Sequence, residues 1–255
     1  MEVLGIDIGG SGIKGALVNT QTGELVTDRM RIPTPQPAKP EAVIATIRKI
    51  VAYFGYQGPL GVGYPGVVID GVTKTAANVD ESWIDFPAAA ALSEAAGCPA
   101  TIGNDADVAG MAEMYHGAGR GHKGVVMVFT LGTGIGSAVF VNGRIIPNLE
   151  LGHLYLRGHK KDVEQYASDR ARTEQKLSWS AWGDRLNSYF QYIDFLFSPQ
   201  LIIIGGGVSK KHKKFLKYIK VNAEVVPAEL RNEAGIVGAA MTAVMTDNTL
   251  PAPPL

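Results

Sequence analysis

Glycines interrupt an apolar run near the N-terminus, beside residues that could bind phosphate. The segment DIGGSGIK spans residues 7–14 and follows a β-rich run. Because glycine lets consecutive backbone N–H groups point into one concavity, such a turn can hold a phosphate group. Asp7 would repel phosphate unless a cation lay between them, so it indicates Mg²⁺, bound directly or through water. The alternative is a hairpin in which the glycines only allow the strands to twist. That alternative does not explain Asp7, because an unpaired carboxylate in a buried apolar strand is costly.

A similar turn recurs about half the chain later. Gly10-Ser11-Gly12-Ile13 has a counterpart in Gly132-Thr133-Gly134-Ile135, and each lies between two β-rich runs. The repeat predicts two lobes of related fold, each beginning with a hairpin that has a glycine-rich turn. The first turn also matches the GxGxxG dinucleotide fingerprint, but the strand-like IKGALV follows where that motif needs a helix. A dinucleotide-dependent dehydrogenase is therefore disfavoured.

Periodicity and turn residues predict the elements that must position these turns. We expect strands over residues 2–9, 13–18, 25–32, 60–62, 101–103, 125–131, 137–141 and 201–204. We expect helices over residues 43–54, 88–96, 107–115, 186–197, 210–220 and 237–244.

Composition excludes several classes of protein. The 255 residues are 46% hydrophobic and 19% charged, with 24 basic and 24 acidic side chains, which is typical of a globular protein and not of a nucleic-acid or membrane-surface binder. The one cysteine, Cys98, excludes an intramolecular disulfide, and we expect it to be an inert core residue. Without a signal-peptide pattern or a bilayer-length apolar run, the sequence predicts a cytoplasmic protein with no membrane or nucleic-acid partner.

The ordered motifs resemble the ROK family of sugar kinases and repressors, in the sugar kinase/actin/Hsp70 superfamily. DIGGSGIK resembles the first phosphate motif, LGTGIG (131–136) the second, and ELGH (150–153) the ExGH motif. The stretches GNDAD, LELGHL and ASDRAR resemble the short members of the family, the polyphosphate glucokinases. The resemblance covers nearly the whole chain in order.

This resemblance implies an α/β protein with a two-lobed ribonuclease H-like/actin-like ATPase fold, a duplicated mixed sheet and a central cleft. We expect an N-terminal lobe over 1–103, joined by the C-terminal helix near 234–246, and a C-terminal lobe over 104–233. The remaining residues, 247–255, are expected to form a flexible tail.

The resemblance also implies residue roles. It identifies Asp105 as the base that accepts the proton of a sugar 6-hydroxyl. The residues alone leave a helix N-cap as the alternative, because Asn104-Asp105 joins a short strand to a helix. Sugar contacts are implied for Gly66, Asn78, Asn104, Asp105, Glu150, His153 and Glu164.

Phosphate and metal contacts complete the expected site. Phosphate contacts are expected from Gly9, Gly10, Ser11, Gly12, Lys14, Thr130, Gly132, Thr133 and Gly134, and nucleotide contacts from Gly205, Gly206 and Gly207. An ordinary strand-to-helix turn is the alternative at 205–207. Asp7 is expected to hold Mg²⁺ through water. The stretch LYLRGHKKDVEQY lacks the cysteines that many relatives carry after ExGH, so no structural zinc is expected.

Two basic stretches suggest an extended anionic partner. One has six lysines between 210 and 220, and the other comprises Arg157, Lys160, Lys161, Arg170, Arg172 and Lys176. A solvated lysine face is the ordinary explanation, but a polyphosphate chain would bind such a track by releasing counterions.

We therefore expect a phosphotransferase, assembled as a homodimer, that moves a phosphoryl group from polyphosphate, ATP or both to the 6-hydroxyl of glucose, giving glucose 6-phosphate. The alternatives are a strictly ATP-dependent hexose kinase for glucose or mannose and a non-catalytic sugar-binding relative. A family repressor is disfavoured because the first phosphate motif begins at residue 7, which leaves no room for a preceding helix-turn-helix.

Overall fold

The computed structural model of the chain describes residues 1–245. These residues form two compact units: Met1–Ala112 together with the residues from Glu233 onward, and Glu113–Asn232. The chain passes between them inside helix α3 (Asp105–His116), after the boundary at 103/104 expected from the sequence. The expected tail, 247–255, lies outside the described residues.

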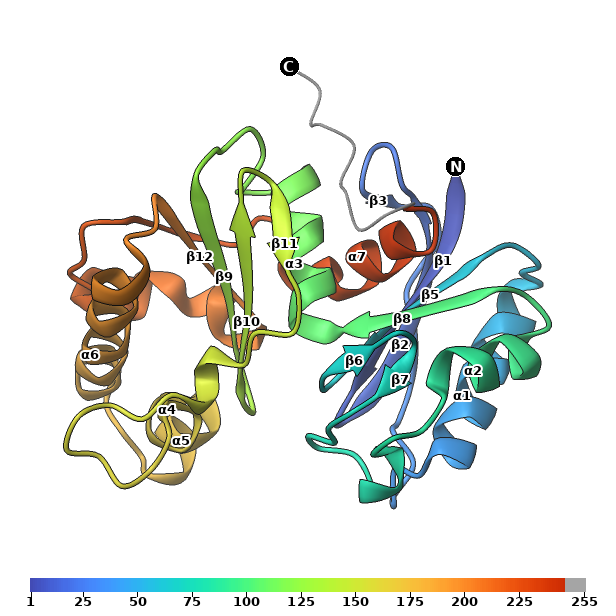
Figure 1. Cartoon of the computed structure of the whole chain (residues 1–255), viewed down its shortest axis with the longest axis horizontal. Coiled ribbons are helices and arrows are strands. Elements are labelled where there is room, and N and C mark those ends of the chain that lie inside the picture. The colour runs from blue at the N-terminus through green and yellow to red at the C-terminus, as the bar shows by residue number, and fades with distance from the viewer. Residues whose placement is uncertain (246–255) are drawn as a thin grey trace. The chain divides into compact units, whose positions relative to one another are not determined.

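The first unit is built on a six-stranded mixed sheet (Figure 1). Strand β1 (Glu2–Gly9) pairs antiparallel with β2 (Gly12–Asn19) and parallel with β5 (Leu60–Tyr64), which pairs parallel with β8 (Ala100–Asn104). Strand β2 also pairs with β3 (Glu24–Leu25) and β4 (Met30–Ile32). A small hairpin, β6 (Val68–Ile69) and β7 (Val72–Thr73), lies outside this sheet.

Residue size decides how closely helices approach the two faces of this sheet. On one face, Leu4, Ile6 and Ile8 share an apolar core with helix α1 (Pro40–Phe54), near which α2 (Ala88–Ala96) also packs. On the other face, a Cβ at Gly5 or Gly61 would overlap the backbone of α7 (Ala234–Thr242). The missing side chains therefore allow α7 to lie directly on β1 and β5 (Figure 1).

The second unit repeats this sheet pattern. Strand β9 (Val125–Leu131) pairs antiparallel with β10 (Ile135–Val141) and parallel with β12 (Leu201–Gly205). Strand β13 (Glu224–Pro227) extends the sheet beside β12, and β11 (Arg144–Ile146) extends it beside β10. Each copy of the glycine repeat therefore occupies the turn of an antiparallel hairpin that is followed by parallel strands, which confirms the predicted duplication and the fold class.

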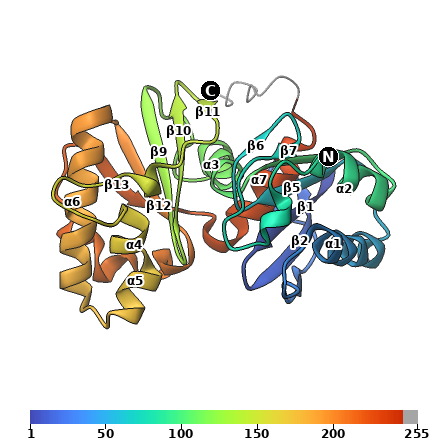
Figure 2. The same ribbon diagram turned by 60° about the horizontal axis from the view of Figure 1, so that its bottom comes forward.

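One long helix forms the core of the second unit. Helix α6 (Trp179–Phe197) buries Leu186, Phe190 and Ile193 against Met127 and Phe129 of the sheet. The short helices α4 (Val163–Ala167) and α5 (Asp169–Glu174) lie near α6 (Figure 2). No helix in the described part of the chain has the length and apolar character needed to cross a bilayer.

Two expected elements were wrong. The single strand over 25–32 is two short strands, because the Thr27 hydroxyl accepts the Leu17 N–H and residues between β3 and β4 leave the ladder. The helix over 210–220 is two 3₁₀ segments, η3 (Gly207–Lys214) and η4 (Leu216–Tyr218), with non-helical dihedrals at Lys211. Clustered lysines repel one another at α-helical spacing, which disfavours a continuous helix there. Further 3₁₀ turns are η1 (Glu81–Trp83), η2 (Leu151–His153) and η5 (Arg231–Glu233).

Candidate active site

The predicted site residues fall into two groups, one in each compact unit. In the first unit, Asp7 and Lys14 are direct partners across β1 and β2, and their side chains form an ion pair of 3.0 Å. The side chains are 17% and 26% exposed, so this carboxylate is largely shielded from water. Lys14 supplies a cation that a carboxylate in an apolar strand needs. The position of Asp7 is thus explained without a metal ion.

Arg31 is a functional candidate that the sequence prediction missed. Its guanidinium donates to the Ser11 carbonyl at 2.7 Å, and a Cβ at Gly12 would lie 2.5 Å from its Nε. Arg31 also lies opposite Lys14 in the β2–β4 register. A second cationic side chain therefore lies beside the first glycine turn. Only the strand register reveals it, because Arg31 is seventeen positions after Lys14 in the sequence.

Two further side chains border the same turn. The Thr34 hydroxyl donates to the Gly9 carbonyl at 2.5 Å. Asn78, an expected sugar ligand, lies close to Gly10: a Cβ added at Gly10 would be 3.3 Å from the Cβ of Asn78. The structure thus places Asn78 beside the first glycine turn.

Asn104 caps helix α3 and leaves Asp105 as its first residue. The Asn104 Oδ1 accepts from the backbone N–H groups of Ala106 and Asp107 at 2.9 and 3.0 Å. Its Nδ2 donates to the Gly66 carbonyl at 3.1 Å, which ties the helix start to the turn after β5. The cap that was an alternative role for Asp105 is therefore provided by Asn104.

Asp105 and Asp7 lie near the same edge of the first sheet. Asp7 is the register partner of Gly63 in β5, and a Cβ at Gly63 would lie 3.7 Å from the Asp105 Cα. This edge carries the carboxyl ends of the parallel strands, where open α/β sheets usually bind ligands. Asp105 therefore lies at the sheet edge where a ligand would be expected.

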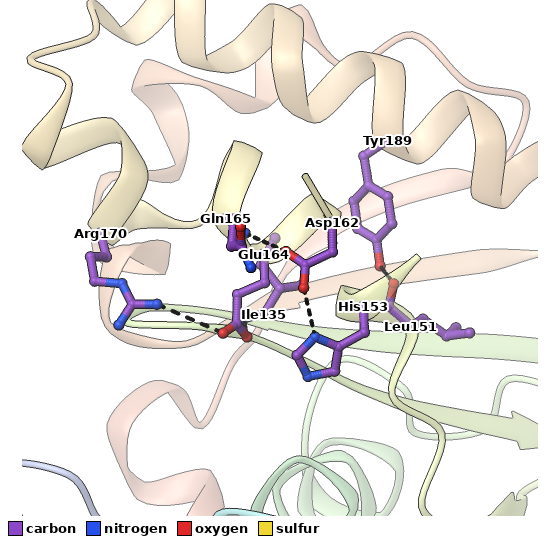
Figure 3. A network of polar contacts seen from close by, with 8 residues as sticks. All are labelled: Ile135, Leu151, His153, Asp162, Glu164, Gln165, Arg170 and Tyr189. Carbon is purple, nitrogen blue, oxygen red and sulfur yellow. Dashed lines mark hydrogen bonds and ion pairs between the residues drawn. The ribbon is translucent and has the colours of Figure 1, made fainter. Parts of the chain in front are cut away.

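In the second unit, the second glycine turn and the ExGH segment form one polar cluster (Figure 3). The Ile135 N–H donates to Glu164 Oε2 at 2.9 Å, and a Cβ at Gly134 would overlap that carboxylate. A Cβ at Gly152 would overlap the Ile135 carbonyl. Glu164, an expected sugar ligand, therefore contacts the backbone of the turn itself.

Backbone anchors hold the ExGH segment against β10 and α6. The Leu151 N–H donates to the Ser137 hydroxyl at 3.0 Å, and the Tyr189 hydroxyl donates to the Leu151 carbonyl at 3.1 Å (Figure 3). Both Leu151 and Tyr189 are buried. Glu150 and His153 are thus carried by a segment whose backbone is fixed between them.

His153 is oriented by Asp162, which the sequence prediction also missed. Their Nδ1 and Oδ2 atoms lie 3.0 Å apart, which leaves Nε2 on the other side of the ring (Figure 3). The hydrogen bond to the Asp162 carboxylate raises the pKa of His153 above its ordinary value of 6.5, and the charges of Glu164 and Glu150 add to this effect. Asp162 also accepts the Gln165 N–H at 2.8 Å and so caps α4, which fixes its carboxylate.

The three glycines at the end of β12, Gly205 to Gly207, lie close to the second turn. Gly205 is the register partner of Thr130, and a Cβ at Gly206 would overlap the backbone of Leu131. Gly206 also has a φ of 79°, a conformation that favours glycine. At the next residue of the turn, the Arg170 N–H donates to the Gly132 carbonyl at 3.2 Å.

The duplicated sheets and their glycine-rich hairpin turns define an actin-like ATPase fold of the sugar-kinase type. The chain belongs to the ROK family, whose model matches residues 3–181. It is 48% identical to a polyphosphate glucokinase of Mycobacterium tuberculosis over 241 residues, which is 94% of this chain and 90% of the relative.

Solved structures give the same family. An inorganic polyphosphate/ATP-glucomannokinase from Arthrobacter sp. strain KM matches with a TM-score of 0.91 at 47% identity, covering 95% of this chain and 98% of that one. A ROK family glucokinase from Streptomyces griseus, in complex with glucose and AMPPNP, matches with a TM-score of 0.79 at 25% identity, covering 94% of this chain and 98% of that one.

Proposed function

We propose that the chain is a glucokinase that transfers a phosphoryl group from inorganic polyphosphate, ATP or both to the 6-hydroxyl of glucose. The observation that carries this proposal is the cluster at Ile135, where a phosphate-type turn, Glu164 and the ExGH segment meet in one unit. The polyphosphate glucokinase of M. tuberculosis and the Arthrobacter glucomannokinase support the same reaction.

In this proposal Asp105 is the general base. It takes the proton of the 6-hydroxyl while that oxygen bonds to the terminal phosphorus of the donor. The bond from this phosphorus to the bridging oxygen breaks, which leaves the donor shorter by one phosphate. The remaining expected sugar contacts orient the ring, and His153 offers Nε2 because Asp162 holds Nδ1.

In this proposal each glycine turn offers backbone N–H groups to phosphate, and Lys14 and Arg31 add positive charge beside the first turn. Mg²⁺ would supply further neutralisation of the donor oxygens. The described part of the chain has no group of three metal-ligating side chains, and Asp7 offers one carboxylate that would bind Mg²⁺ through water. These residues fit an Mg²⁺ ion that is bound mainly by the phosphate oxygens of the donor.

Activity assays with each donor and sugar test this function. Purified protein is given Mg²⁺, glucose or mannose, and polyphosphate or ATP, and the hexose 6-phosphate is measured. We expect product from glucose with polyphosphate. Product with ATP only would establish the strictly ATP-dependent alternative, and glucose binding without product from any donor would establish a non-catalytic relative.

The variant Asp105→Asn tests the proposed base. Because the proton acceptor is lost while the side-chain shape remains, we expect kcat to fall about 10²–10⁴-fold with glucose binding retained. Glucose-dependent thermal stabilisation measures that binding. Asp70→Asn, an exposed aspartate of the same unit, serves as the matched control. Near-normal turnover of Asp105→Asn would refute the role of Asp105.

We further propose a cytoplasmic homodimer as the working form. Light scattering of the purified protein tests the dimer, and a monomeric mass at assay concentration would contradict it.

A further inference from the structure

The two basic stretches of the sequence meet at one aromatic ring in the second unit. The Arg172 guanidinium lies 4.3 Å from the ring centroid of Trp179. The Nζ atoms of Lys214 and Lys211 lie 5.5 and 5.8 Å from the same centroid. All three distances are within the range of cation–π attraction. Arg172, Lys211, Lys214 and Trp179 are called the Trp179 cluster below.

The ring of Trp179 is held in place by neighbouring aromatic side chains. It stacks on Phe215 with ring centroids 6.2 Å apart, and it packs edge-on against Trp182 at 5.8 Å. Trp182 and Phe215 are buried, and the Trp182 indole donates to the Ala167 carbonyl at 2.8 Å. The cations therefore gather around a fixed, partly exposed surface.

The cluster has excess positive charge. Arg172 is paired with Asp169 at 2.7 Å, so its charge is largely balanced. Within residues 1–245, no carboxylate lies within salt-bridge distance of Lys211 or Lys214, and both side chains are exposed. Two uncompensated ammonium groups near the same ring attract a polyanion.

The same two segments begin at the second glycine turn. Helix α5 starts beside it, since the Arg170 N–H donates to the Gly132 carbonyl. Segment η3 starts from Gly206, which lies against the backbone of Leu131, the residue before Gly132. The segments that border the turn are thus the ones whose later residues, Arg172, Lys211 and Lys214, form the Trp179 cluster.

Resting on the proposed function, we propose that the Trp179 cluster binds the part of a polyphosphate chain that extends beyond the second turn. ATP and tripolyphosphate carry only three phosphates, and in this proposal those phosphates extend no further than the second turn. A long chain continues along α5 and η3 and is held by Lys211 and Lys214. The cluster therefore increases affinity for long chains without contacting the reacting phosphate.

The test compares Lys211→Gln/Lys214→Gln with a control, Lys210→Gln/Lys213→Gln, which removes the same charge from the same exposed segment. We expect the first variant to raise the KM for long-chain polyphosphate about tenfold and to reduce the salt dependence of log KM by a slope of about 1.4, near 0.7 per lost phosphate contact. Its kcat and its KM for ATP and tripolyphosphate should match those of the wild type. The control should show a much smaller rise.

The outcomes separate this inference from the proposed function. If the wild type uses long-chain polyphosphate and the Lys211/Lys214 variant keeps the same KM and salt slope, the inference is wrong and the function stands. An equal rise in KM for the control pair would also overturn it, because overall charge would then explain the effect. If the wild type makes product with ATP but not with polyphosphate, the inference is wrong while the ATP-dependent form of the function stands. Absence of product with any donor would refute both.

Discussion

At the scale of single residues, the hydrogen bond between His153 and Asp162 makes a prediction about pH. The raised pKa of His153 means that the ion pair contributes stability that is fully present below about pH 6.5 and is lost as pH rises through the raised value. In Asp162→Asn the pKa of His153 should fall, measured by NMR titration of its ring. The asparagine still caps α4, so the fold is kept.

Two controls sharpen this test. Asp169→Asn removes a carboxylate that pairs with Arg172 instead, and it should leave the His153 titration unchanged. The stability difference between wild type and Asp162→Asn, measured by urea unfolding, should shrink from pH 6 to pH 8. A titration curve of His153 that is the same with and without Asp162 would contradict the assigned orientation.

The residue scale also shows where sequence inference stops. Asn104 and Asp105 are neighbours that both cap helices well, so their order alone could not decide which one caps α3. The hydrogen bonds of Asn104 to Ala106 and Asp107 decide it. Arg31 and Asp162 could not be predicted from local patterns. Strand pairing brings Arg31 to the first glycine turn, and the course of a loop brings Asp162 to His153. The roles of the sugar and phosphate residues stay predictions.

At the scale of elements, the contact between α7 and α3 should tolerate no added side chain. A Cβ at Gly238 would overlap the Val108 carbonyl, so Gly238→Ala forces the two helices apart. We expect the free energy of unfolding to fall by about 1–3 kcal/mol, measured by urea denaturation. Gly207→Ala is the matched control, since its Cβ would meet nothing within 4 Å. Equal stability of both variants would argue against this close packing.

Elements with a clear local pattern were predicted well. Both glycine hairpins follow from the β-rich runs on either side of their turns. Helix α6 follows from apolar residues at helical spacing, although the helix begins at Trp179, before the predicted start at residue 186. The region 210–220 was mispredicted because lysines have good helix propensity individually, whereas their mutual repulsion and the burial of Phe215 favour 3₁₀ turns. Propensity describes residues one at a time and misses this conflict.

At the scale of the whole molecule, the chain passes from one unit to the other at 112/113 and returns at 232/233. Glu113 forms hydrogen bonds that link the chain segments near these two positions. Its buried carboxylate accepts the backbone N–H groups of Ala118, Glu229 and Leu230 at 3.1, 3.1 and 2.8 Å. Glu113→Ala leaves these donors without their acceptor, so we expect the free energy of unfolding to fall by about 3 kcal/mol or more. Glu94→Ala, at an exposed helical position, should be nearly neutral.

The destabilisation caused by Glu113→Ala should depend on pH. Burial raises the pKa of Glu113 above its ordinary value of 4.5, so native stability falls as pH rises from that value through the raised pKa. Glu113→Ala lacks this dependence, and its destabilisation should therefore be largest at acidic pH. Urea unfolding at several pH values measures it, and a loss that grows with pH would contradict the assignment.

The family and fold class were predictable because the motifs recur in order along the chain, and the enzyme class follows from the same motifs. The division of the chain was harder to predict, since no change of composition marks it. The boundary between the units lies inside the continuous helix α3, between Ala112 and Glu113. A boundary within a helix is not marked by the glycine, proline or charge clusters that indicate a linker.

Helix α7 also has a consequence for biosynthesis. It covers β1 and β5, which leave the ribosome long before it does, whereas the second unit is one continuous stretch of chain that emerges in between. A nascent polypeptide therefore keeps the glycine-lined face of its earliest sheet open to water until α7 is translated. A premature stop codon before Ala234 would release a protein with an intact middle and an uncovered first sheet.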